Sequence, residues 1–158
     1  MDIFSHGLWG RGLFGYRGYP GVAIFFGIFP DLFSFGIFGV MRVLQGNFQL
    51  GPPPLEIIPD WIIFNYHFSH SFITVIIVIG WIAYRKKELA FAMLGWPLHI
   101  MMDFPFHTSN YFPTQFLWPI TDYSISGISW SNPWVWFPNL TGIIILYYYR
   151  FKQKRGSI

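Results

Sequence analysis

The stretch WIIFNYHFSHSFITVIIVIGWIAY, residues 61–84, is long and apolar enough to cross a lipid bilayer, yet it carries His67 and His70. A transmembrane helix needs about 20 mostly apolar residues, and ionisable side chains are rare in such segments unless they serve a function. This stretch therefore predicts both a membrane location and a buried polar site.

The composition of the whole chain is that of an integral membrane protein. Hydrophobic residues make up 53% of the 158 residues and only 11% are charged, whereas a soluble domain carries about 25% charged residues. The length fits a single domain over residues 1–158. Because the chain has no cysteine, disulfides, thiolate zinc sites, iron–sulfur clusters and covalently attached c-type haem are excluded.

Four apolar segments predict an all-α fold, an integral membrane bundle of about four transmembrane helices. Residues 61–84 form the second segment, and the others are residues 19–44, 89–107 and 136–151. Residues 2–16 precede them and predict a short amphipathic helix that lies at the membrane interface.

Basic residues indicate the orientation of this bundle. RKK at residues 85–87 follows the second segment, and RFKQKR at residues 150–155 ends the fourth. Under the positive-inside rule both lie in the cytoplasm, so four spans place both termini inside and the segments 45–60 and 108–133 outside. Arg42 then lies on the outer side, against the rule.

The net charge of +3 raises the question of nucleic acid as a partner. The basic residues lie beside the apolar segments, which fits membrane topology better. We therefore expect the lipid bilayer as the partner and no nucleic acid. The sequence does not indicate an oligomeric state.

The polar residues associated with the apolar segments are histidines and aspartates. In chain order, beginning just before the first segment, they are His6, Asp31, His67, His70, His99, Asp103 and His107. No Lys, Arg or Glu joins this set, so the carboxylates lack cations with which to form ion pairs. A divalent metal ion would neutralise them.

The spacing supports a metal site. His99 and Asp103 are four residues apart, and His67 and His70 are three apart, so each pair shares one face of a helix. Four converging nitrogen and oxygen ligands suit zinc, at distances of about 2.0–2.2 Å. We expect one or two ions, and the histidine content favours zinc over manganese or magnesium.

Prolines interrupt the segments that carry these residues. Pro105 disfavours helix at the preceding residue, so His107 continues the face of Asp103 only if the helix passes this proline. Pro97 predicts a kink one turn before that face. Pro30 breaks the first segment, and a broken helix at membrane depth is tolerated where it lines a cavity.

Four short motifs resemble those of the membrane-bound metal-dependent hydrolase family, in the family's order. They are SHGLWG at residues 5–10, FPDLFSFG at 29–36, HFSHS at 67–71 and HIMMDFPFHT at 99–108. The chain departs from the family's HRxxTHS and HxxxDxxT patterns, because Phe68 replaces the arginine and the threonine three residues after Asp103 is absent.

This resemblance, with a more distant similarity to zinc-dependent phospholipase C, implies hydrolysis of a lipid or isoprenoid phosphoester. It implies that one ion is held by Asp31, His70, His99 and Asp103. His6 would join Asp103 at a second ion, and His67 or His107 would complete a site. Asp31 would orient the attacking water or accept its proton, and His67 is the other candidate catalytic residue. The aromatic segment 111–137 would shape an opening for acyl chains.

Three other functions fit the same residues. A metal or proton transporter would use them as a relay and predicts ion flux. A b-type haem protein with His70 and His99 as axial ligands predicts a coloured preparation. A structural membrane protein with incidental histidines predicts that no metal copurifies.

Overall fold

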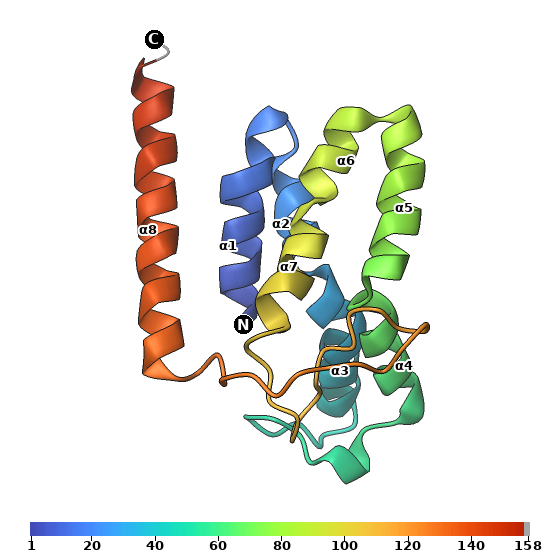
Figure 1. The fold of residues 1–158 in the computed structure, drawn as a ribbon. Helices are drawn as coiled ribbons and strands as arrows, with labels where there is room; N and C mark the ends of the chain where they lie inside the picture. Colours follow the sequence, from blue (N-terminus) through green and yellow to red (C-terminus); the bar gives the residue numbers. More distant parts are fainter. Residues whose placement is uncertain (157–158) are drawn as a thin grey trace.

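The computed structural model describes residues 1–156, and in this part of the chain the regular structure is helical and contains no β-strand (Figure 1). This confirms the predicted all-α class. The α-helices are α1 (Ile3–Phe14), α2 (Pro20–Asp31), α3 (Ile37–Leu44), α4 (Asp60–Ser69), α5 (Phe72–Arg85), α6 (Lys87–Met93), α7 (Gly95–Asp103) and α8 (Pro133–Gly156). A π-helix, Leu32–Gly36, joins α2 to α3, and 3-10 turns occupy Gly15–Arg17 and Leu55–Ile57.

Helix length and apolar composition identify one clear candidate membrane span among the described residues. It is the continuous run Pro20–Leu44, which consists of α2, the π-helix and α3. α4 and α5 pass the same test together, but they are bent by 56° at the break between them, as in a broken span or a re-entrant segment. The four-span arrangement therefore stays a prediction.

The third predicted span, residues 89–107, is not one helix. A single turn residue, Leu94, separates α6 from α7, and α7 ends at Asp103, two residues before Pro105. This interruption lies three residues before Pro97, on the side where a proline disrupts a helix. Pro97 lies in the first turn of α7, where its missing N–H removes no helical hydrogen bond.

The N-terminal helix α1 forms as predicted but packs inside the bundle. Its buried face consists of small and polar residues, among them Ser5, His6 and Gly7, whereas Phe4 is 78% exposed. α1 approaches α2 closely at Gly27, where an added Cβ would lie 2.5 Å from the carbonyl oxygen of His6. α1 therefore brings His6 to the middle of the bundle.

Two apolar clusters flank the break between α4 and α5. The first consists of Phe38, Ile58, Ile62, Tyr66 and Phe112, and the second of Val75, Trp96 and Ile100. The Tyr66 ring stacks on His70, with ring centroids 4.0 Å apart. Trp96 Nε1 donates a hydrogen bond to the carbonyl oxygen of Ser69 at 2.6 Å. Ser69 and His70, the polar residues at the break, are thus held in place by contacts with both clusters.

Apolar side chains are exposed along the sides of the bundle, and the basic residues gather at one end. Ile76, Trp81 and Ile144 are each at least 60% exposed, and such exposure along whole helices is uncommon in soluble monomers. All of the Lys and Arg residues except Arg42 lie where α1 ends, where α5 meets α6 and where α8 ends. These three places are at the same end of the bundle, the top of Figure 1.

Candidate metal centre

Four of the predicted ligands meet in the middle of the bundle. Asp31, His70, His99 and Asp103 each offer one ligand atom, and these atoms all lie within 4.8 Å of one another. They come from the end of α2, the break between α4 and α5, and the last two turns of α7. The two histidines and Asp103 are at most 1% exposed. The group could hold a metal ion.

Backbone carbonyls orient both imidazoles of this group. His99 Nδ1 lies 2.7 Å from the carbonyl oxygen of Gly27, and His70 Nδ1 lies 2.9 Å from that of Tyr66. A carbonyl can only accept, so each Nδ1 carries a proton, and in the neutral ring each Nε2 then presents a lone pair. Histidines that bind a metal through one ring nitrogen usually donate a hydrogen bond from the other nitrogen in this way. Both lone pairs therefore point to the same place.

The distances between donors are close to the edges of a tetrahedron. Two ligands of one zinc ion at about 2.0–2.1 Å lie about 3.3–3.4 Å apart in tetrahedral geometry. The Nε2 atoms of His70 and His99 are 3.1 Å apart. Asp103 Oδ2 lies 3.1 Å from the His99 nitrogen and 3.7 Å from the His70 nitrogen. Asp31 Oδ1 lies 3.6 Å and 3.8 Å from the same nitrogens.

Irregular backbone delivers two of the four donors. His70 is the C-cap of α4, and Ser71 begins α5 by accepting a hydrogen bond from Ile73 N–H. Asp31 stands at the junction of α2 and the π-helix. Single π-turns in α-helices occur frequently at functional sites. The carbonyl oxygen of Pro30, next to Asp31, accepts hydrogen bonds from Ser34 and from Ser69 across the bundle.

Asp103 is the most deeply enclosed carboxylate of the group and is incompletely satisfied. Its Oδ1 contacts the N-terminal ammonium of Met1 and lies 3.0 Å from His6 Nε2. Its Oδ2 is buried and accepts no hydrogen bond of acceptable geometry, although His99 Nε2 is near. A buried carboxylate oxygen without a donor is costly, and an ion between Oδ2 and the two imidazoles would satisfy it.

His6 packs against the four-donor group and faces the other carboxylate oxygen of Asp103, Oδ1. Its ring stacks on His99, with centroids 3.7 Å apart. His6 is buried, and neither of its ring nitrogens has a hydrogen-bond partner of acceptable geometry. At this second predicted position the described residues bring together His6, Asp103 Oδ1 and the Met1 ammonium. The geometry therefore provides a complete donor set for one ion.

The remaining two predicted histidines stay outside the four-donor group. His107 follows the end of α7, yet its Nε2 is 3.5 Å from Asp103 Oδ2, because one more turn follows the helix and His107 N–H donates to the carbonyl oxygen of Asp103 at 3.0 Å. Its Nδ1 lies 3.0 Å from the carbonyl oxygen of Phe112. His67 is half-buried and stacks on Trp118. The helix ends between His67 and His70, so the two rings do not share one helical face.

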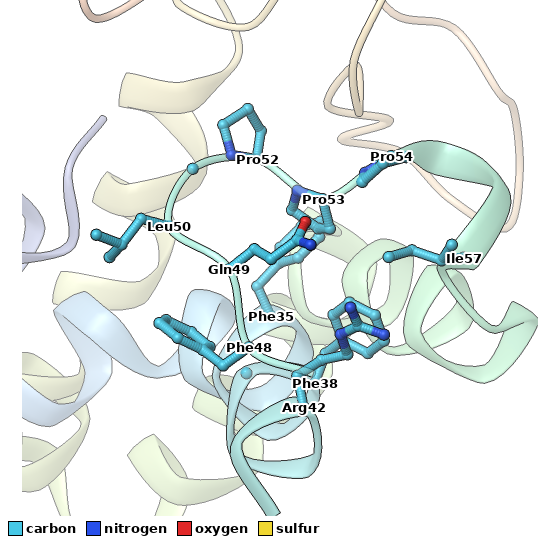
Figure 2. Close-up of a pocket in the computed structure, with 12 residues that line it drawn as sticks. Phe35, Phe38, Arg42, Phe48, Gln49, Leu50, Pro52, Pro53, Pro54 and Ile57 are labelled. Carbon is cyan, nitrogen blue, oxygen red and sulfur yellow. The ribbon is translucent and has the colours of Figure 1, made fainter. Parts of the chain in front are cut away.

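A small cavity lies one layer of side chains away from the centre. Its volume is about 200 Å³, and Figure 2 shows it between α3 and the proline-rich segment 48–57. Phe35 and Phe38 line it, and Arg42 is the charged residue of its wall. Phe35 also contacts Tyr66, which stacks on His70. The cavity is therefore continuous with the packing around the centre.

The first part of the aromatic segment after α7 packs against Tyr66 and the proline-rich segment. Phe112 and Thr114 are buried, and Tyr111 donates a hydrogen bond to the carbonyl oxygen of Pro53 at 2.8 Å. The Tyr66 hydroxyl lies 3.0 Å from the Phe112 carbonyl oxygen and 3.1 Å from His107 Nδ1. The cavity beside the centre is lined by residues of the other predicted outer segment.

Several positioning residues had no clear signal in the sequence. Gly27 and Tyr66 act through their carbonyl oxygens, which every residue has. The hydrogen bond from His70 to the Tyr66 carbonyl oxygen joins residues four apart in the chain, so a search for carbonyl groups that orient a histidine ring could have found it. Gly27 is 72 residues from His99 in the chain, and spacing cannot reveal such a contact.

Comparison of the chain with family models, with curated proteins and with solved structures finds no match. Functional inference therefore depends on the centre itself. Two carboxylates flank the narrow space between the imidazoles of His70 and His99, and the two nitrogens are only 3.1 Å apart. This arrangement suits a small cation and leaves no room for a porphyrin between the rings.

Proposed function

We propose that the chain is an integral membrane, metal-dependent hydrolase that cleaves a phosphoester of a lipid or isoprenoid phosphate. The observation that carries this proposal is the convergence of two imidazole nitrogens and two carboxylates, Asp31, His70, His99 and Asp103, on one point. A mixed nitrogen and oxygen set of four suits zinc better than magnesium or calcium, which prefer oxygen alone.

The proposed membrane location is supported by the surface of the bundle. Apolar side chains are exposed along α5 and α8, and the run Pro20–Leu44 is long and apolar enough to span. The basic residues gather at one end. His70 lies about 21 Å along α5 from that end, since α5 has 14 residues. The centre would therefore lie within the bilayer's thickness, on the side away from the basic end.

The chemistry follows from the exposure of the four ligands. An ion held there would lower the pKa of a bound water towards about 7 and polarise a phosphoryl oxygen. Asp31 is 23% exposed, whereas the side chains of His70, His99 and Asp103 are at most 1% exposed. A substrate would thus approach from the side of Asp31, whose carboxylate would orient the attacking water and accept its proton.

Groups beside the centre would complete the reaction. His107, with a side chain 18% exposed, and the half-buried His67 are the neighbouring imidazoles with solvent access. Either one would protonate the leaving oxygen. The cavity of Figure 2, lined by Phe35 and Phe38, would accept part of the apolar chain of the substrate.

The deciding experiment is elemental analysis of the detergent-purified chain together with an assay on lipid phosphoesters. We expect roughly one zinc-type ion per chain in the wild type and its loss in Asp103→Asn and His99→Ala. Asp122→Asn, which changes an exposed loop carboxylate in the same way, should keep the ion. Wild type without metal after zinc is added back, or full occupancy in Asp103→Asn, would overturn the metal assignment.

Hydrolysis is tested separately from metal binding. Because Asp31 is also a proposed ligand, Asp31→Asn is compared with the wild type at equal metal content, and it should then lower the rate of phosphoester cleavage by about 10²–10⁴-fold, the usual contribution of a general base. A metal-loaded wild type that cleaves no phosphomonoester or phosphodiester lipid would contradict the hydrolase assignment while leaving the metal centre in place.

Ion transport is the second candidate, and the broken helix favours it. Transporters commonly bind ions where a membrane helix is interrupted, as α4 and α5 are at His70. Zinc flux into vesicles that contain the chain, with no phosphoester cleavage, would select transport over hydrolysis.

A further inference from the structure

A second and larger cleft lies at the basic end of the bundle. Its volume is about 700 Å³, and it is bounded by the end of α1, the turn after it and the last turns of α8. The charged and aromatic residues of its wall are Arg11, Tyr16, Tyr147, Arg150, Phe151 and Lys154. Three of them are cations, and in the described part of the chain none of the lining residues is acidic.

The Arg150 side chain is held in place and keeps further N–H donors for a ligand. Its Nε donates a hydrogen bond to the carbonyl oxygen of Gly12 at 2.8 Å, and its Nη1 donates one to Gln153 Oε1 at 3.0 Å. The guanidinium also lies over the Tyr16 ring, 4.1 Å from its centroid. Those two hydrogen bonds use two of the five guanidinium N–H groups. The side chain is thus positioned before any ligand arrives.

An apolar stripe leads along α8 away from these cations. Phe151, Ile144 and Phe137 are seven residues apart in turn, so they share one face of the helix, and they are 52–60% exposed. The stripe covers about 21 Å of helix. A ligand with an anionic head at the cleft would have room for a hydrocarbon chain along this face.

We propose that this cleft binds the phosphate of an anionic phospholipid headgroup, with the acyl chains along α8. Arginine and lysine without carboxylate partners complement a phosphate, and basic pockets between membrane helices bind such headgroups. The apolar stripe selects a lipid over free phosphate. The inference rests on the membrane location proposed above and not on the hydrolytic reaction, because the first residue of the cleft, Arg11, lies about 7.5 Å along α1 from His6.

The test measures binding of fluorescently labelled phosphatidylglycerol to the detergent-solubilised full chain. Arg11→Gln with Lys154→Gln removes two exposed cations from the cleft. Arg85→Gln with Lys87→Gln is the matched control, because it removes the same charge from the same end of the bundle outside the cleft. Bound metal and the unfolding temperature are measured in both variants to verify an intact fold.

We expect the cleft variant to bind about 25-fold more weakly, since each basic side chain near an anionic headgroup contributes a factor of about five. The control should bind like the wild type, and phosphatidylcholine should compete poorly. If both variants lost lipid affinity equally, the effect would be one of general surface charge, and the proposal would be overturned. Displacement by inorganic phosphate as effectively as by unlabelled phosphatidylglycerol would identify a soluble ligand and also overturn it. Loss of hydrolysis without loss of lipid binding would separate this proposal from the proposed function.

Discussion

Gly27 links the packing of the helices to the geometry of the metal centre. Its lack of a side chain lets α1 approach until a Cβ there would lie 2.5 Å from the carbonyl oxygen of His6. Its own carbonyl oxygen lies 2.7 Å from His99 Nδ1 and so directs His99 Nε2 towards the other ligands. Gly27 thus helps to determine the positions of the His6 and His99 imidazoles.

Substitution Gly27→Ala should therefore disturb both stability and metal binding. The methyl group would force α1 away from α2, and such overpacking costs about 1–3 kcal/mol. We expect the midpoint of thermal unfolding to fall by about 3–10 °C and the bound metal to decrease. Gly80→Ala is the control, because an added Cβ at Gly80 meets nothing within 4 Å. Wild-type unfolding and full metal content in Gly27→Ala would show that α1 adjusts without cost.

At the scale of the element, α8 depends on a few polar contacts with α1. Asn139 is 7% exposed; it donates a hydrogen bond to Ser5 Oγ at 2.8 Å and accepts one from Trp9 Nε1 at 2.7 Å. Tyr147 and Arg150 add hydrogen bonds to carbonyl oxygens of α1 further along. α8 stands at the margin of the bundle, beside α1 (Figure 1).

Asn139→Ala should loosen α8 and leave the centre intact. The change deprives Trp9 Nε1 and Ser5 Oγ of a buried partner, at a cost of about 1–3 kcal/mol. We expect faster proteolysis in the segment before α8 and an unchanged metal content. Thr141→Ala, an exposed neighbour on the same helix, should behave as the wild type. Metal loss in Asn139→Ala would instead mean that α8 supports the centre.

At the scale of the whole molecule, charge and apolar surface are arranged along one axis. The ends of α1, α5 and α8 carry the basic residues, and Arg42 is the exception near the opposite end, beside the cavity of Figure 2. Under the positive-inside rule we expect the basic end of the bundle to lie in the cytoplasm. The metal centre would face the outer half of the bilayer.

Reporter fusions test this orientation. A fluorescent protein fused after Gly156 should fluoresce, and alkaline phosphatase fused at the same place should be inactive, because that end of α8 would be cytoplasmic. Alkaline phosphatase inserted after Gly51, in the segment at the other end, should be active. The reverse pattern would place the centre towards the cytoplasm and contradict the proposed topology.

The sequence by itself determined the helical class and the ligand chemistry. Apolar runs without strand alternation predict helices, and those helices form. Histidine and aspartate stand out in such runs because their burial is costly, so the seven candidates His6, Asp31, His67, His70, His99, Asp103 and His107 could be selected without a structure. Chain order and residue type were sufficient for this step.

Only the tertiary structure decided which candidates meet and how the helices are divided. Because α4 ends just before His70, the His70 side chain points to the other metal ligands, whereas His67 stacks on Trp118. Local spacing had predicted that the two histidines share one helical face. A further hydrogen-bonded turn across Pro105 keeps His107 near Asp103 although α7 has ended. These outcomes depend on helix ends, close glycine contacts and carbonyl orientation. Such features involve backbone groups that are alike in every residue, so the sequence pattern carries little information about them.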